Sequence, residues 1–366
     1  MQILLQLSFS LVGGLLMSRL AKKLNLPAVT AYLVTGLILG PYCLGALGVS
    51  QLGFATPEAV SNLNMISQVA LGFIAFTIGN EFRLAQLKSM GKQAITVGIL
   101  QAVVTTALVD AALVGLHFIN PDLISVSSAI TLGAIAAATA PAATLMVVRQ
   151  YKADGPLTRL LLLVVAIDDA VGLVLFSASF GVATALESGS VNVVTVLVEP
   201  VVEIVLSLLL GGMAGWVLYR VEKYFHSRSK RLSISIGFVL LTVGLSMVEF
   251  EVGGMHCGFS RLLVCMMTGN VFCNICDFSE ELMGRVDGWT TPLFVLFFVL
   301  SGAELNLNIL SNPMVLFIGL VYIVSRSLGK YAGAYGSCAL THCSDHIKKH
   351  LGITLLPQPA WPWAWP

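Results

Sequence analysis

The sequence predicts an all-α polytopic membrane protein, and two properties of the chain lead to this fold class. Of its 366 residues, 57% are hydrophobic and only 11% are charged, whereas soluble chains carry about a quarter charged residues. The hydrophobic residues also form runs of about 20, which is the length of a helix that crosses the hydrocarbon core of a bilayer. We therefore expect about eleven or twelve spans joined by short loops.

Apolar segments follow one another along the chain, each bounded by charged residues or by turns that contain proline, glycine or asparagine. The first segment has no charged leader and no small-residue cleavage site, which predicts a retained helix and not a signal peptide. The segments cover residues 3–20, 28–44, 63–79, 93–118, 123–148, 157–185, 193–219, 232–249, 257–274, 289–304 and 313–341.

The basic residues indicate how the helices are oriented. Lysine and arginine gather in the loops after odd-numbered segments, and the loops after even-numbered segments carry none. By the positive-inside rule this predicts that the N-terminus lies on the outer side of a cell membrane. Three bases, Arg261, Arg326 and Lys330, lie within predicted spans, where ionisable side chains are candidates for functional sites. Arg261 lies near a helix end, and we expect it to extend its charge to the membrane surface and not to take part in a site.

Several classes of function find no basis in this sequence. The net charge is +1 and no basic stripe is present, so a nucleic-acid partner is not expected, and the lipid bilayer is the predicted surrounding. Cys273 and Cys276 form a lone C-x-x-C without further ligands, so we predict no resident metal and no cofactor. No nucleophile with a base and no phosphate loop stands out, so an enzyme is not predicted.

Asp168 and Asp169 are the strongest candidates for a site. They lie about 18 Å along the segment that starts at Pro156, near the bilayer midplane, and about 100° apart around the helix. A buried carboxylate whose pKa is raised by burial and by a like charge can hold either a proton or a cation. Oxygen ligands suit Na⁺ or Li⁺. The pair therefore predicts cation:proton antiport from one site; the alternative is a structural pair, one acid bound to a base and the other protonated.

The segment 123–148 contains a predicted helix break. Pro141 removes a backbone hydrogen bond at mid-membrane, and Thr139 and Thr144 offer hydroxyl groups beside the break. Discontinuous helices that present carbonyls and dipole ends to an ion recur in secondary transporters. We predict that both threonines contribute to the ion site; the alternative is a simple proline kink with packed threonines.

The segment 313–341 supplies the predicted counter-charge. Arg326 and Lys330 are four residues apart and therefore share one face of a helix. A buried cation needs an anion, and Asp168 is the obvious candidate. The alternative is a clamp that joins two helices without taking part in transport.

With these features in view, the chain resembles the monovalent cation:proton antiporter family, in its second branch of bacterial sodium/proton antiporters and potassium-efflux transporters. The resemblance covers essentially the whole sequence. It rests on the Asp168-Asp169 pair and on the stretches RLAKKLNLPAVTAYLVTGLILGP, ALGFIAFTIGNEF, TAPAAT, PLFVLFFVLSGAEL and SRSLGKYAGA.

The resemblance implies an antiporter fold in which a core of two inverted repeats, each with one broken crossing helix, moves like an elevator against a dimerising scaffold. It also implies a homodimer and a place in a bacterial inner membrane. Carried onto this chain, it predicts scaffold helices in 1–90, the first core repeat in 91–186, a linker helix in 187–230, scaffold helices in 231–308 and the start of an incomplete second repeat in 309–366.

The resemblance further implies roles for the site residues. Asp169 would be the main cation and proton ligand, Asp168 its partner, Thr139 a polar contact and Arg326 the counter-charge. Family members that move two protons per sodium carry a lysine at that last position, and arginine does not release its proton. The predicted function is therefore exchange of Na⁺ or Li⁺ for H⁺ with the stoichiometry open. The alternatives are a K⁺/H⁺ antiporter and a non-transporting fragment or membrane sensor.

The last nine residues differ from the family pattern. Residues 358–366 read QPAWPWAWP, and three prolines in nine residues cannot continue a spanning helix. Deleting one guanine from a coding of the family-like QAGVALGMA yields QPAWPWAWP. We therefore expect a frameshifted or C-terminally truncated gene; a resequenced locus without a family-like continuation in the shifted frame would contradict this.

Overall fold

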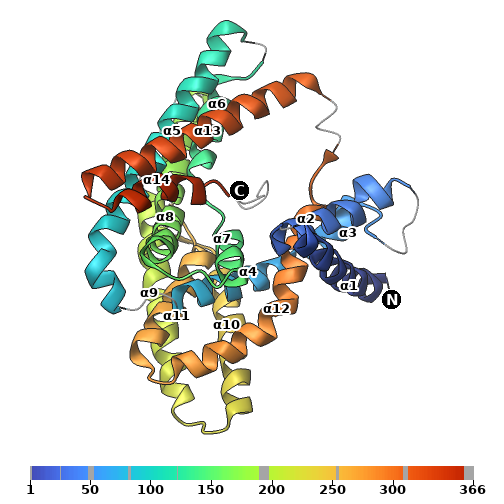
Figure 1. Ribbon diagram of the computed structural model, residues 1–366, viewed down its shortest axis with the longest axis vertical. Coiled ribbons are helices and arrows are strands. Elements are labelled where there is room, and N and C mark those ends of the chain that lie inside the picture. Colours follow the sequence, from blue (N-terminus) through green and yellow to red (C-terminus); the bar gives the residue numbers. More distant parts are fainter. Residues whose placement is uncertain are drawn as a thin grey trace.

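The computed structural model describes residues 2–24, 26–47, 53–80, 84–121, 123–188, 198–252, 255–307 and 312–357. It is an assembly of helices with one short antiparallel hairpin, β1 paired with β2 (Figure 1). The elements are α1 (Gln2–Lys23), α2 (Ala28–Leu39), η1 (Pro41–Gly45), α3 (Pro57–Ser61), α4 (Asn64–Asn80), α5 (Leu84–Ile119), α6 (Val126–Ala137), α7 (Pro141–Gln150), α8 (Pro156–Ser188), α9 (Glu199–Glu222), α10 (Arg228–Ser246), β1 (Phe250–Val252), β2 (Met255–Cys257), α11 (Arg261–Ile275), α12 (Ser279–Ala303), α13 (Pro313–Leu340) and α14 (Asp345–Thr354).

Every predicted apolar segment coincides with one or more helices, although the first residues of segment 193–219 lie outside the described part. Within the described residues, 9 helices are long and apolar enough to cross a membrane. Two further predicted segments form shorter helices, α4 with 17 residues and α11 with 15. The protein is therefore a multi-pass membrane protein, as predicted.

One predicted boundary is wrong by ten residues. The segment expected at 289–304 begins at Ser279, so Arg285 and Asp287 belong to α12 and not to a loop. With 25 residues, α12 is about 37 Å long and exceeds the roughly 30 Å hydrocarbon core. Its first turns can therefore carry charges outside the membrane, where apolar composition no longer marks a helix.

The predicted break in segment 123–148 is present and separates α6 from α7. Ala138 and Ala140 have extended backbone angles, and Pro141 is the first residue of α7. Proline suits this position because it lacks the N–H that a first helical residue leaves unpaired, and its ring forces the preceding residue out of the helical region. Residues 138–140 thus form a short non-helical segment between two half-helices.

A second non-helical stretch meets this break. After α14 ends at Thr354, the chain reaches Pro357, whose carbonyl oxygen accepts a hydrogen bond of 3.0 Å from the amide of Ala140. Pro357, the last described residue, thus lies beside the break. Residues 358–366, on which the prediction of an interrupted second repeat rests, lie outside the described residues.

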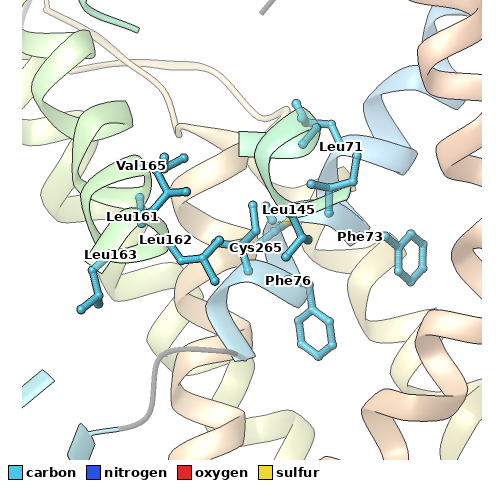
Figure 2. Close-up of a cluster of buried hydrophobic side chains, with 14 of the residues drawn as sticks. Leu71, Phe73, Phe76, Leu145, Leu161, Leu162, Leu163, Val165 and Cys265 are labelled. Carbon is cyan, nitrogen blue, oxygen red and sulfur yellow. The ribbon is translucent and has the colours of Figure 1, made fainter. Parts of the chain in front are cut away.

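The helices around the break are held in place by a buried apolar cluster (Figure 2). Leu145 of α7 and the leucines at the start of α8 pack with Phe76 of α4 and Cys265 of α11. Between helices in a bilayer such contacts act through close packing and dispersion, because lipid is as apolar as leucine. The cluster therefore fixes where α8 presents its polar residues.

Candidate functional site

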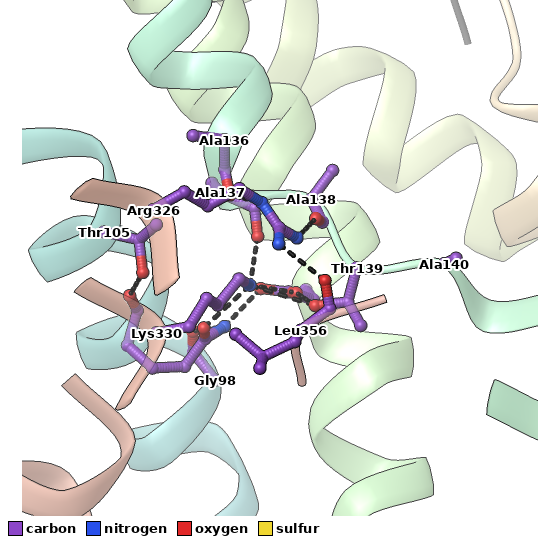
Figure 3. Close-up of polar contacts among 12 residues, drawn as sticks. Gly98, Thr105, Ala136, Ala137, Ala138, Thr139, Ala140, Arg326, Lys330 and Leu356 are labelled. Atoms are coloured by element: carbon purple, nitrogen blue, oxygen red, sulfur yellow. Dashed lines mark hydrogen bonds and ion pairs between the residues drawn. The ribbon is translucent and has the colours of Figure 1, made fainter. Parts of the chain in front are cut away.

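Asp168 belongs to a buried polar group that joins α5, α6, α8 and α13. Figure 3 shows the part of this group around Lys330, Thr139 and Arg326. One carboxylate oxygen, Oδ2, lies 3.0 Å from Nζ of Lys330 on α13 and also accepts a hydrogen bond from the hydroxyl of Thr139. The other oxygen, Oδ1, accepts from the side-chain amide of Gln101 on α5. Both oxygens of Asp168 are therefore bound by protein groups.

Lys330 completes the same group from α13. Its ammonium also donates to Oε1 of Gln101 at 2.8 Å, to the hydroxyl of Thr139 at 2.9 Å and to the carbonyl of Ala137. The side chains of Lys330 and Asp168 are both 0% exposed. A buried charge is tolerated only when it is paired and hydrogen-bonded, and this ammonium meets both conditions.

Arg326 has a different role from the one predicted. Its guanidinium donates to the carbonyl oxygens of Ala136 at 3.1 Å, Ala138 at 2.9 Å and Leu356 at 2.6 Å. It thereby ties the end of α6 and the break to the chain that follows α14 (Figure 3). The ion pair with Asp168 belongs to Lys330, one turn further along α13.

This corrects the expected pairing of Arg326 with Asp168. The reason is geometric: the two bases share a face of α13 but lie about 6 Å apart along its axis, so one reaches the helix break and the other reaches α8. The stoichiometry was left open because an arginine was expected beside Asp168. A lysine, which can release a proton, occupies that place.

Asp169 has surroundings unlike those of Asp168. Its Oδ2 atom is buried and has no hydrogen-bond partner among the described residues. A buried, unsatisfied carboxylate oxygen in a native protein calls for an explanation such as a bound ion or a proton. One acid of the pair is thus bound by the protein, and the other has an oxygen available for a ligand.

The two threonines predicted at the site separate in the structure. Thr139 contacts both Asp168 and Lys330, whereas the hydroxyl of Thr144 donates to the carbonyl of Ala140, the residue just before α7, at 2.9 Å. Pro141 lies at the break, as expected, where it begins α7. The third intramembrane base, Arg261, lies apart from this group and donates to Gln68 of α4.

Gln101 is the site residue that the sequence analysis missed. It is fully buried and bonds to both members of the ion pair. A signal was present in the sequence, because an amide inside the apolar segment 93–118 is a polar group that must find a partner within the membrane. The sequence predicted a helix break with free carbonyls in this region, but it did not indicate that the carbonyls of residues 136–138 would bind Arg326 and Lys330.

Known proteins similar to this chain are transporters. The chain is 24% identical over 337 residues to "Probable Na(+)/H(+) antiporter 3" of Methanocaldococcus jannaschii, covering 91% of this chain and 79% of the relative. It is 23% identical to "Na(+)/H(+) antiporter 1" of the same organism, covering 90% and 76%. A "Glutathione-regulated potassium-efflux system protein" of Haemophilus influenzae is 22% identical, covering 89% of this chain and 49% of the relative.

The fold matches a solved antiporter, and a family model covers nearly the whole chain. The structure of the sodium proton antiporter MjNhaP1 from Methanocaldococcus jannaschii at pH 8 superimposes with a TM-score of 0.72 at 20% identity, covering 98% of this chain and 85% of that one. The family described as "Sodium/hydrogen exchanger, transmembrane" matches residues 7–361. The chain therefore belongs to the family of transmembrane sodium/hydrogen exchangers.

Proposed function

We propose that this protein exchanges Na⁺ or Li⁺ for protons across a membrane by alternating access to the Asp168-Asp169 site. Membership of the exchanger family and the similarity to named Na⁺/H⁺ antiporters support cation:proton exchange as the reaction class. The observation that carries the site is the buried Oδ2 of Asp169, which has no hydrogen-bond partner in the described part of the chain, beside an Asp168 whose two oxygens are both bound.

In the proposed cycle, Asp169 carries either a proton or a cation and never both. Each loaded form is electrically neutral at that carboxylate, whereas the unloaded form leaves a charge buried in the membrane, which is costly. Only the loaded forms can then change access without a large penalty. This competition makes the movement of one ion depend on the movement of the other.

Lys330 gives the site a second group able to hold a proton. Its ammonium is stabilised by Asp168, Gln101 and Thr139. If Asp168 turns toward an entering cation, the ammonium loses its charge partner and its proton is more easily released. The arrangement therefore supports exchange of more than one proton per cation, with Asp169 and Lys330 as the two proton carriers.

The test is collapse of a pH gradient in inverted vesicles on addition of Na⁺, Li⁺ or K⁺. We expect Na⁺ and Li⁺ to dissipate the gradient, and Asp169→Asn to abolish the response because an amide cannot exchange a proton for a cation. Asp154→Asn is the matched control, since Asp154 is an exposed acid held by Arg159 outside the predicted spans.

Each other outcome contradicts part of the proposal. Exchange that survives Asp169→Asn would remove Asp169 from the site. A response to K⁺ alone would favour the K⁺/H⁺ alternative, which the similarity to a potassium-efflux protein suggests. No response to any cation by the unaltered chain would favour the non-transporting fragment or sensor.

A further inference from the structure

Gln101 contacts both halves of the buried ion pair at once. Its Oε1 accepts from Lys330 Nζ at 2.8 Å, and its Nε2 donates to Asp168 Oδ1 and to the carbonyl of Gly98, the latter at 3.1 Å. The main-chain carbonyl oxygen of Gln101 accepts a hydrogen bond from the hydroxyl of Thr105 at 2.6 Å. The residue is 0% exposed, and both ends of its side-chain amide are engaged.

The orientation of this amide follows from the chemistry of its neighbours. An ionised carboxylate only accepts hydrogen bonds and an ammonium only donates them. The nitrogen of Gln101 must therefore face Asp168 and its oxygen must face Lys330. A carboxylate at position 101 would repel Asp168, and a hydrocarbon side chain would leave one oxygen of Asp168 and one proton of Lys330 without a partner.

We propose that Gln101 is a positioning residue of the exchange reaction, whose amide holds Asp168 and Lys330 in one fixed pairing and decides which oxygen of Asp168 a cation can meet. The inference rests on the proposed function. Lys330 and Thr139 both bind Oδ2 of Asp168, and Gln101 donates a hydrogen bond to the other oxygen, Oδ1. When the ion pair opens, Oδ1 keeps its amide donor, and only Oδ2, which loses the ammonium and keeps the Thr139 hydroxyl, can meet the cation.

The charged groups around this amide are few, which makes a pH test interpretable. Asp168 and Asp169 come from α8, and Arg326 and Lys330 come from α13. The neighbouring α6–α7 break contributes the Thr139 hydroxyl and main-chain carbonyls. A titratable group introduced at position 101 would therefore add a third acid to this set of two acids and two bases.

Two substitutions at position 101 separate hydrogen bonding from space filling. Gln101→Met keeps the length of the side chain and removes its polar atoms. Gln101→Glu restores the two contacts with the ion pair at low pH, because a protonated carboxyl presents one O–H donor to Asp168 and one carbonyl acceptor to Lys330; only the bond to the carbonyl of Gly98 is lost. At high pH the carboxylate loses its donor and repels Asp168.

The experiment measures exchange in vesicles and thermal unfolding of the purified full chain, both across pH. We expect Gln101→Met to slow exchange on the order of tenfold or more at every pH, the size expected for lost hydrogen bonds to charged groups. We expect Gln101→Glu to match the unaltered chain at the acidic end and to fall below it as pH rises. Gln93→Met, which removes the bond from another α5 glutamine to Thr341, should leave the pH profile unchanged.

A swap tests the contact itself without transport. In Gln101→Glu with Asp168→Asn, the acid and the amide exchange places around Lys330, so the number of charges is preserved and, of the hydrogen bonds made by the two side chains, only the one to the carbonyl of Gly98 is lost. The melting temperature of the double variant should recover at least half of what Asp168→Asn alone loses.

The two readouts distinguish failure of this inference from failure of the proposed function. Gln101→Met with the rate and pH profile of the unaltered chain, or identical pH profiles for Met and Glu, would overturn the positioning role. No recovery of the melting temperature in the swap would do the same. An unaltered chain that exchanges no cation would refute the proposed function. The melting temperatures of the swap would still test whether Gln101 and Asp168 interact.

Discussion

Asp168 and Lys330 form an ion pair that is completely buried within the helix bundle. Neither side chain is exposed, and their charged atoms are 3.0 Å apart. The free energy that such a pair adds relative to an apolar pair is small, because taking both charges out of water offsets much of their attraction. The loss on removing one partner alone is large, since the other is left buried and unpaired.

This asymmetry gives a prediction at the residue scale. Lys330→Met should destabilise the folded protein by about 3–5 kcal/mol, because Asp168 keeps hydrogen bonds from Gln101 and Thr139 but loses its counter-charge. The double variant Lys330→Met with Asp168→Asn should recover a substantial part of that loss. Thermal unfolding of the purified proteins in detergent measures both, and equal destabilisation of the single and double variants would show that the pair is not what holds Asp168.

Arg326 and Lys330 are not interchangeable, because their charged groups differ in shape. The planar guanidinium of Arg326 reaches three carbonyl oxygens on two separate pieces of chain, which a single ammonium cannot do with the same geometry. Those carbonyls lie at the end of α6 and after α14, where helical partners are missing. Arg326 therefore satisfies backbone groups, while Lys330 serves the acid on α8.

At the scale of elements, the crossing of α4 and α11 shows how closely two helices can approach in this protein. A Cβ atom at Gly79 would lie 1.8 Å from the carbonyl oxygen of Met266, and one at Gly269 would lie 2.0 Å from that of Phe76. Each glycine therefore faces the backbone of the other helix. Small residues allow this approach and the dispersion contacts that come with it.

The crossing predicts the effect of a single added methyl group. Gly269→Ala should destabilise the protein by about 1–3 kcal/mol or more, because the methyl group meets backbone that cannot move aside. Gly237→Ala on α10, where no heavy atom lies within 4 Å of the added Cβ, should be neutral or stabilise by up to about 1 kcal/mol. Melting temperatures compare the two, and similar values for both variants would mean that α4 and α11 can separate without cost.

At the scale of the whole molecule, α7 links two groups of helices. It follows the break beside α8 and ends near α2 and α12 (Figure 1). Arg149 at its end lies 2.8 Å from Asp287 of α12, and Gln150 accepts a hydrogen bond of 2.8 Å from the amide of Ala28. If the predicted core, 91–186, moves against the predicted scaffold, these contacts must break during transport.

A cross-link tests this movement. Arg149→Cys with Asp287→Cys, joined by a reducible bifunctional thiol reagent, should lower exchange on the order of tenfold and regain it on reduction, as expected when a required conformational step is blocked. Arg228→Cys with Glu281→Cys, which joins α10 to α12 at an exposed ion pair, should leave exchange unchanged. Full activity of the first cross-linked protein would exclude relative motion of α7 and α12.

The sequence by itself determined the membrane class, the positions of the spans, the break and the acidic pair. These features are local: an apolar run of a given length, a proline among small residues, or two carboxylates in a hydrophobic segment has the same meaning wherever the helix lies. Only charged extensions such as the first turns of α12 escaped this reasoning, because they lie outside the apolar pattern.

The tertiary structure alone decided which base serves Asp168 and what else surrounds it. Lys330 and Gln101 are separated by 229 positions in the chain, and their meeting depends on how α5, α8 and α13 cross and rotate about their axes. Successive helical residues point about 100° apart, so a small rotation changes which side chain faces a partner. No local pattern specifies that rotation. For this reason Gln101 was missed, and the two predicted counter-charges, Arg326 and Lys330, could not be told apart from the sequence.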